Sequence, residues 1–127
     1  MNAAANCGRR ALVIDDSIAM RRMVSFTLSA SGFDVVEGGN GVEGLQALDE
    51  NPVDLIVADV NMPEMDGLTF VRAARSRPAY RFVPILMLTT DSTKSKVQEG
   101  RAAGATGWLV KPFKPERLLD VVSKVLP

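Results

Sequence analysis

The feature that most constrains the fold is a short apolar run at residues 55–58 (Leu-Ile-Val-Ala), which ends on the acid Asp59. A run of this length with β-branched members is typical of an interior strand of a parallel sheet. Pro63 follows closely, so the chain leaves the strand soon after the acid. Asp59 is therefore expected at the carboxyl end of a strand, where open α/β sheets bind their ligands.

Four further segments have the composition of strands, and apolar residues at helical spacing lie between them. The strands are expected at residues 11–14, 33–37, 84–88 and 107–110. One helix is expected between a cap at Asn40 and a stop at Asn51-Pro52. The others are expected at residues 18–31, 67–76, 91–103 and from 115 to the C-terminus. Five strands that alternate with five helices predict one α/β domain, a doubly wound parallel sheet with helices on both faces. We assign it to the flavodoxin-like class, whose strand order is 2-1-3-4-5.

The sequence also predicts helix caps and helix faces. Candidate N-caps precede three helices and are Ser17 or Asp16, Asn40, and Asp66. In the first helix, Arg21 and Arg22 are expected to face solvent. In the second, Val42, Leu45 and Leu48 are expected to lie on one helical face.

The helix expected at 91–103 differs from the others because it is strongly polar. Val97 is its one large apolar residue, and Gly100 lies inside it. A helix with so little apolar surface to bury is expected to pack weakly and is a candidate for motion.

Composition excludes several classes of protein. The chain has 127 residues, the length of one domain, and its 15 basic and 15 acidic residues cancel, which argues against binding to nucleic acid or a membrane surface. Residues 1–63 carry 4 basic and 9 acidic residues and residues 64–127 carry 11 and 6, which predicts an acidic and a basic side.

The single Cys7 and the lack of His argue against disulfides and against zinc or haem sites. Since no segment approaches ~20 apolar residues, we expect a cytoplasmic protein without membrane insertion.

Charged and hydroxyl side chains follow the strands that share one edge of the predicted sheet. They are Asp15, Asp16, Asp59, Thr89 and Lys111. In the order 2-1-3-4-5 the first and third strands are neighbours, so three carboxylates converge in one crevice. Three like charges at close range persist either with a raised pKa or around a cation, and a shallow oxygen cluster suits Mg²⁺.

These residue types are those of phosphoryl transfer. The main-chain carbonyl of Asn61 is a further candidate ligand for Mg²⁺, while the Thr89 hydroxyl and the Lys111 ammonium can hold an anion beside the metal. Positioning and charge neutralisation supply most of the catalysis in such reactions. Asp59 is the candidate nucleophile, because a carboxylate can form an acyl phosphate.

Five short motifs carry a resemblance to a known family. They are Val-Ile-Asp15-Asp16-Ser, Met-Arg-Arg-Met, Ala-Asp59-Val-Asn61-Met-Pro63-Glu-Met-Asp66-Gly67, Met-Leu-Thr89-Thr90 and Val-Lys111-Pro112-Phe113. In this order and spacing they make the chain resemble the receiver domains of bacterial two-component response regulators, and among these the CheY-like single-domain chemotaxis regulators. The resemblance runs from about Arg10 to the C-terminus.

The resemblance implies a role for each residue at the strand ends. Asp59 would accept a phosphoryl group from a phosphohistidine of a sensor histidine kinase, in a stoichiometric event rather than enzymatic turnover. Asp16, Asp59 and the Asn61 carbonyl would bind Mg²⁺ directly, with Asp15 nearby or acting through water. Thr89 would hydrogen-bond the phosphoryl oxygens, and Lys111 would pair with the carboxylate or phosphate.

The resemblance also assigns positions around this site. Asn61 and Asp91 would tune the lifetime of the acyl phosphate, and the bond before Pro112 is expected to be cis. Trp108 stands where the family usually has a switching Tyr or Phe. It is expected to move as Thr89 moves, which would change the face built from the helix at 91–103, the last strand and the last helix. The alternative is that Trp108 is simply a half-buried strand aromatic.

Residues 1–9 are expected to form a disordered tail and residues 10–127 a monomeric receiver domain. Its expected output is direct contact with a downstream protein, such as a flagellar motor switch protein. A phosphate sink or a phosphorelay outside chemotaxis would use the same chemistry.

Two other classes of protein share parts of this pattern. A Mg²⁺-dependent aspartyl phosphohydrolase of the haloacid-dehalogenase type usually has a second Asp two residues after the nucleophile, where this chain has Asn61. A flavodoxin-like flavin binder needs a phosphate loop after the first strand, where this chain places two negative charges that would repel phosphate.

Overall fold

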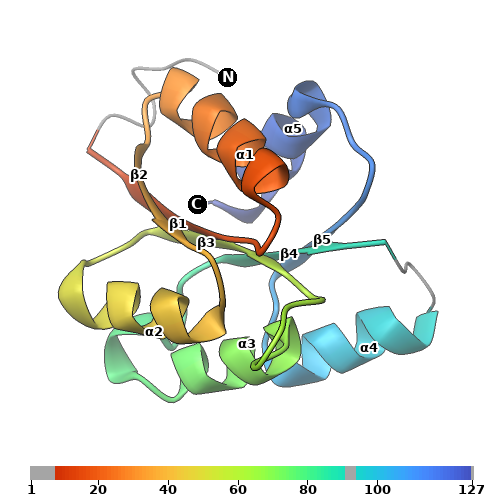
Figure 1. Cartoon of the computed structure of the whole chain (residues 1–127). Coiled ribbons are helices and arrows are strands. Elements are labelled where there is room, and N and C mark those ends of the chain that lie inside the picture. The colour runs from red at the N-terminus through yellow and green to blue at the C-terminus, as the bar shows by residue number, and fades with distance from the viewer. Residues whose placement is uncertain (1–7, 91–93, 127) are drawn as a thin grey trace.

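The computed structural model describes residues 8–90 and 94–126, apart from the side chain of Lys94. Most of the tail expected at 1–9 lies outside the described residues, as does Asp91. Within the described ranges, one five-stranded sheet lies between two layers of helices (Figure 1).

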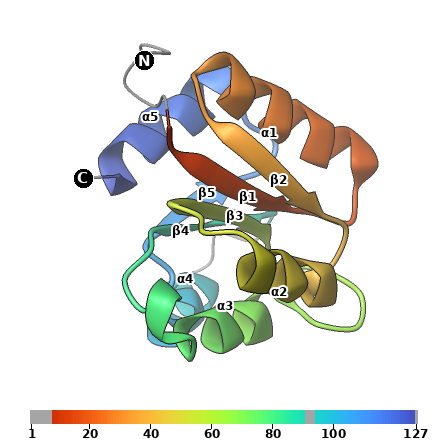
Figure 2. The same cartoon turned by 90° about the vertical axis from the view of Figure 1, so that its left-hand side faces the viewer.

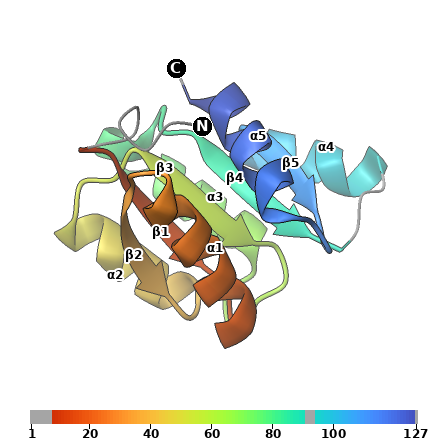
Figure 3. The ribbon, with the colours of Figure 1, turned by 90° about the horizontal axis from the view of Figure 1, so that it is seen from above.

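All five strands are parallel and follow the order β2-β1-β3-β4-β5, which confirms the predicted fold class. The strands are β1 (Arg10–Ile14), β2 (Asp34–Gly38), β3 (Leu55–Asp59), β4 (Ile85–Thr89) and β5 (Gly107–Val110). Because they run the same way, their carboxyl ends meet at one edge of the sheet (Figure 3). Ile14 of β1 lies opposite Ala58 of β3, so the residues that follow, Asp15 and Asp59, lie side by side.

Helices cover both faces of this sheet. They are α1 (Ile18–Ala30), α2 (Gly41–Glu50), α3 (Gly67–Arg75), α4 (Lys94–Ala103) and α5 (Pro115–Val125), with a short 3-10 helix, η2 (Pro78–Tyr80). α1 and α5 lie together on one face, and α2, α3 and α4 cover the other (Figures 1 and 2). None of the helices in the described part of the chain has the length and apolar character needed to cross a bilayer.

The central strands are buried on both sides, and successive side chains enter two different cores. On β1 and β3, Leu12 and Ile56 belong to the core under α2, α3 and α4, whereas Val13 and Val57 belong to the core under α1 and α5. All four side chains are fully buried. Burial of each is worth about 1.5–3 kcal/mol, so both cores hold the strand ends in fixed positions.

Side-chain caps begin three of the helices. Ser17 caps α1, Asn40 caps α2 and Asp66 caps α3. Each side-chain oxygen accepts a hydrogen bond from the backbone N–H three residues further on, at 2.8–3.3 Å. These bonds satisfy N–H groups that the first helical turn leaves without a helical partner, as the sequence predicted.

The prediction that Arg21 faces solvent is wrong. Its side chain is only 18% exposed. Its Nε donates to Glu37 Oε1, and its Nη1 donates to the main-chain carbonyl of Asp15, both at 2.9 Å. The start of α1 lies beside the ends of β1 and β2, so the carbonyl of Asp15 and the carboxylate of Glu37 are both within reach of Arg21. Arg22 is exposed, as predicted.

The predicted apolar face of α2 is only partly covered, because Leu48 is buried and Leu45 half-buried but Val42 is 43% exposed. Gly41 and Gly44 are buried instead. A Cβ on Gly44 would overlap the side chain of Ile14, and one on Gly41 would lie 2.8 Å from the sulfur of Met65. The helix therefore lies close to β1 at Gly44 and close to the loop before α3 at Gly41, two contacts that the spacing of large apolar residues does not reveal.

Candidate functional site

Three carboxylates meet at the carboxyl edge of the sheet. Asp15 follows β1 and is fully buried, Asp59 ends β3 and is 5% exposed, and Asp16 is exposed. One carboxylate oxygen of each lies within 4.8 Å of the others. An oxygen-only cluster with one solvent-facing member is the donor set that Mg²⁺ accepts, because Mg²⁺ keeps several waters and takes one or two carboxylates.

Lys111 supplies the positive charge of the site. It follows β5, and its Nζ lies 3.2 Å from Asp15 Oδ2 and 3.2 Å from Asp59 Oδ1. The Lys111 side chain is 15% exposed, so both ion pairs are largely shielded from water. The peptide bond between Lys111 and Pro112 is cis.

The acidic surroundings change the ionisation of Asp59. Burial raises the pKa of its carboxyl group, and the negative charge of Asp15 raises it further. The ammonium of Lys111 and the N–H of Asn61, which lies 3.4 Å from Asp59 Oδ1, offset part of this rise in pKa. A cation bound at this site would therefore favour the charged form of Asp59.

The loop after β1 is held by hydrogen bonds to Asp15. Its Oδ1 accepts from the N–H of Ser17 at 2.9 Å, and its main-chain carbonyl accepts from Arg21. Sequence reasoning missed this contact of Arg21. Helical spacing gave no signal for it, since the partner is a backbone carbonyl outside the helix.

The loop after β3 depends on Gly67. The N–H of Gly67 donates to the carbonyl of Val60 at 2.8 Å. A Cβ on Gly67 would overlap the carbonyl oxygen of Asp59 and lie 2.7 Å from the Cα of Val60. Gly67 therefore allows α3 to begin directly against the end of β3, which fixes the backbone of Asp59.

Thr89 and Asn61 lie at the same edge of the sheet as the carboxylates. Thr89 ends β4 and is 1% exposed, and its main-chain carbonyl accepts from the N–H of Lys111 at 2.7 Å. Asn61 is exposed in the loop after β3. Asp91 lies outside the described residues.

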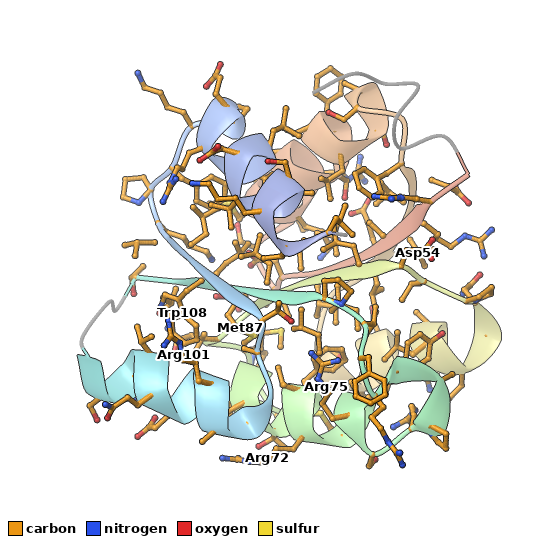
Figure 4. The ribbon with its side chains drawn as sticks, turned by 180° about the vertical axis from the view of Figure 1, so that it is seen from behind. Asp54, Arg72, Arg75, Met87, Arg101 and Trp108 are labelled. Carbon is orange, nitrogen blue, oxygen red and sulfur yellow. The ribbon has the colours of Figure 1, made fainter. Side chains whose placement is uncertain are left out.

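Trp108 lies away from the carboxylates. It pairs with Met87 across β4 and β5, and its indole occupies the space between the sheet and α4 (Figure 4). A surface cavity of about 500 Å³ lies next to Trp108 and is lined by residues of β5, of the loop that follows it and of the start of α5. Its lining includes Trp108, Val110, Phe113, Lys114 and Arg117.

The fold and the site together define a class of protein. Residues 11–123 match the response regulator receiver domain family, and the chain belongs to this family. Receiver domains are signalling proteins rather than conventional enzymes, and they bind Mg²⁺ at an acidic cluster that corresponds here to Asp15, Asp16 and Asp59.

Chemotaxis proteins are among the relatives of the chain. It is 42% identical over 117 residues to chemotaxis protein CheY1 of Helicobacter pylori, covering 91% of this chain and 94% of that protein. It is 41% identical to a CheY homolog of Campylobacter jejuni, covering 91% and 90%. The solved structure of the chemotaxis response regulator CheY4 of Vibrio cholerae is 50% identical, with a TM-score of 0.90 and coverage of 93% and 98%.

Proposed function

We propose that this chain is a phosphorylation-activated switch in bacterial chemotaxis and that Asp59 accepts the phosphoryl group from a histidine kinase. The observation that carries the proposal is the convergence of Asp15, Asp16 and Asp59 on one edge with Lys111 Nζ 3.2 Å from two of them. Membership of the receiver family and similarity to chemotaxis proteins over 91% of the chain support it.

In the proposed reaction an oxygen of Asp59 attacks the phosphorus of a phosphohistidine. The new P–O bond forms as the P–N bond breaks, and the histidine nitrogen leaves with the electron pair and takes a proton from solvent. A raised pKa makes the ionised carboxylate of Asp59 more basic and hence a better nucleophile. Lys111 then pairs with the phosphoryl oxygens, and Thr89 donates its hydroxyl hydrogen to one of them.

Asp16, Asp59 and the main-chain carbonyl of Asn61 are proposed to hold Mg²⁺, with Asp15 nearby. The oxygen-only donor set and the exposure of Asp16 fit this ion. The bound ion would neutralise charge on the phosphoryl oxygens. Asn61 and Asp91 are proposed to set how readily water reaches the acyl phosphate, and thus how long it survives.

The output is proposed to run through Thr89 and Trp108 to the face formed by α4, β5 and α5. Movement of Thr89 toward the phosphoryl group would draw Trp108 with it and reshape the cavity at β5 and α5. A flagellar motor switch protein is the proposed target. A phosphate sink would share the chemistry at Asp59 but would not need a partner at this face.

The remaining parts of the proposal concern the whole chain. Residues 10–127 would act as one receiver domain, with residues 1–9 as a tail, in the cytoplasm. Its phosphorylation and dephosphorylation at Asp59 would be stoichiometric events of a signalling protein.

Intact-mass spectrometry after incubation with acetyl phosphate tests the proposal. We expect one Mg²⁺-dependent phosphoryl adduct in the wild type and none in Asp59→Asn. An adduct of equal yield in Asp59→Asn would overturn the assignment. Sustained release of phosphate with many turnovers per protein would instead favour a phosphohydrolase.

A further inference from the structure

The indole of Trp108 packs directly against a glycine inside α4. A Cβ on Gly100 would overlap Cζ3 of Trp108 and lie 2.7 Å from Cη2 and 3.1 Å from Cε3. All three atoms belong to the six-membered ring of the indole. The ring therefore occupies the space that any side chain at position 100 would need.

Few other residues hold α4 to the sheet. In the described part of this helix, Gly100 and Ala103 are buried and Val97 is half-buried. The remaining described side chains of the helix are exposed. Because glycine is a poor helix former, its presence in the interior of α4 lowers the intrinsic stability of a helix that already has little apolar surface.

The C-terminal end of α4 is fixed close to this contact. The guanidinium of Arg75, on α3, donates to the carbonyl of Gly104 from Nε at 3.1 Å and from Nη2 at 2.8 Å (Figure 4). The carbonyl of Gly100 accepts from the N–H groups of Gly104 and Ala105. Gly100, which contacts Trp108, thus lies one helical turn before the end of α4 that Arg75 holds.

Packing, rather than hydrogen bonding, holds the indole in this position. The Nε1 of Trp108 is buried and has no hydrogen-bond partner among the described residues. A buried N–H without a partner costs free energy, so the inward position is not strongly favoured by polar contacts. A cavity of about 50 Å³, lined in part by Val97, Arg101 and Thr106, lies beside the ring and leaves limited room for displacement.

We propose that Gly100 is a positioning residue for Trp108. Because Gly100 has no side chain, the indole can lie directly against α4, and the position of the ring is coupled to the position of that helix. This inference rests on the role proposed above for Trp108 in the switch. It explains why a poor helix former stands inside α4: a larger residue at position 100 and an inward indole at position 108 exclude each other.

The test is Gly100→Ala in the full chain, followed by Trp emission, acrylamide quenching and urea unfolding. Trp108 is the single tryptophan, so emission reports this residue. We expect emission at longer wavelength, stronger quenching and a lower urea midpoint. If Gly100 were only a poor helix former, Ala would raise the midpoint and leave emission unchanged, and that result would overturn the proposal.

Further variants distinguish loss of the contact between Trp108 and Gly100 from general destabilisation of α4. On a Trp108→Phe background the smaller ring leaves room, so Gly100→Ala should no longer lower the urea midpoint, measured by circular dichroism. An equal loss on both backgrounds would contradict the proposal. Ala102→Gly, at an exposed position of the same helix, should lower the midpoint without shifting Trp emission.

These readouts need no phosphoryl donor, so they remain decisive if the proposed function fails. Acetyl phosphate labelling of Asp59 in Gly100→Ala should persist, because Gly100 lies outside the carboxylate cluster. Loss of labelling together with unchanged Trp emission in this folded variant would show that Gly100 acts on the acceptor site itself and would overturn its assignment to Trp108.

Discussion

Lys111 Nζ lies 3.2 Å from Asp59 Oδ1 and, at the same distance, from Asp15 Oδ2. The lysine thus joins two carboxylates that are almost fully buried and that repel each other. Removal of this one cation would leave two buried acids without their shared partner, which is costly in a poorly solvated site.

Lys111→Ala should lower the free energy of unfolding by roughly 1–3 kcal/mol at neutral pH in metal-free buffer. Urea unfolding measures this change. The control is Lys124→Ala, which breaks an exposed pair with Asp120 and should cost no more than about 1 kcal/mol. Equal stability of Lys111→Ala and the wild type would show that the two acids do not depend on Lys111.

Asp59→Asn should stabilise the metal-free protein at neutral pH. Burial and the charge of Asp15 raise the pKa of Asp59, so the folded state binds its proton more tightly than the unfolded state does. The wild type therefore loses stability as pH rises from about 4 through the raised pKa, and Asp59→Asn does not. The difference should be largest near neutral pH and vanish in acid. A difference that is independent of pH, measured by urea unfolding from pH 3 to 7, would count against this cause.

Mg²⁺ should raise the melting temperature of the wild type, because an ion that binds only the folded state stabilises it by mass action. The shift should shrink in Asp16→Asn and in Asp59→Asn, since each removes one carboxylate of the cluster. Glu50→Gln removes an exposed acid on α2 and should keep the full shift. Differential scanning fluorimetry with increasing MgCl₂ makes the comparison, and equal shifts in all variants would point to non-specific ion binding.

The neighbouring arginines of α1 offer a matched pair. Arg21→Ala removes a hydrogen bond to the Asp15 carbonyl and an ion pair with Glu37, and should cost about 1–2 kcal/mol. Arg22 is exposed, so Arg22→Ala should change stability by less than about 0.5 kcal/mol. Urea unfolding of both variants decides the matter, and similar losses would mean that the contacts of Arg21 contribute nothing measurable.

The sequence predicted the alternation of strands and helices and the residues that follow each strand because both are short-range patterns. β5 has the predicted bounds of 107–110, and Asn40 and Asp66 cap the helices that they were predicted to cap. The strand order came from the assigned fold class, and with β1 beside β3 it places Asp15 next to Asp59.

Close tertiary approaches were beyond the reach of such patterns. Val42 fitted a helical apolar face, yet it is exposed while Gly44 packs against Ile14 of β1. Arg21 was predicted to face solvent because its partners, Glu37 and the carbonyl of Asp15, lie outside α1. The contact between the indole of Trp108 and Gly100 depends on the distance between α4 and β5, which no local sequence signal encodes.

The most direct test of the central claim is Trp108 emission while Mg²⁺ and then beryllofluoride, a phosphoryl mimic, are added to the wild type and to Asp59→Asn. Trp108 lies outside the carboxylate cluster, so its response reports transmission from Asp59 to the face at α4 and β5. We predict a Mg²⁺-dependent change in emission on addition of beryllofluoride, and no such change in Asp59→Asn. Unchanged emission in a wild-type protein whose Asp59 carries the mimic would contradict the proposed switch.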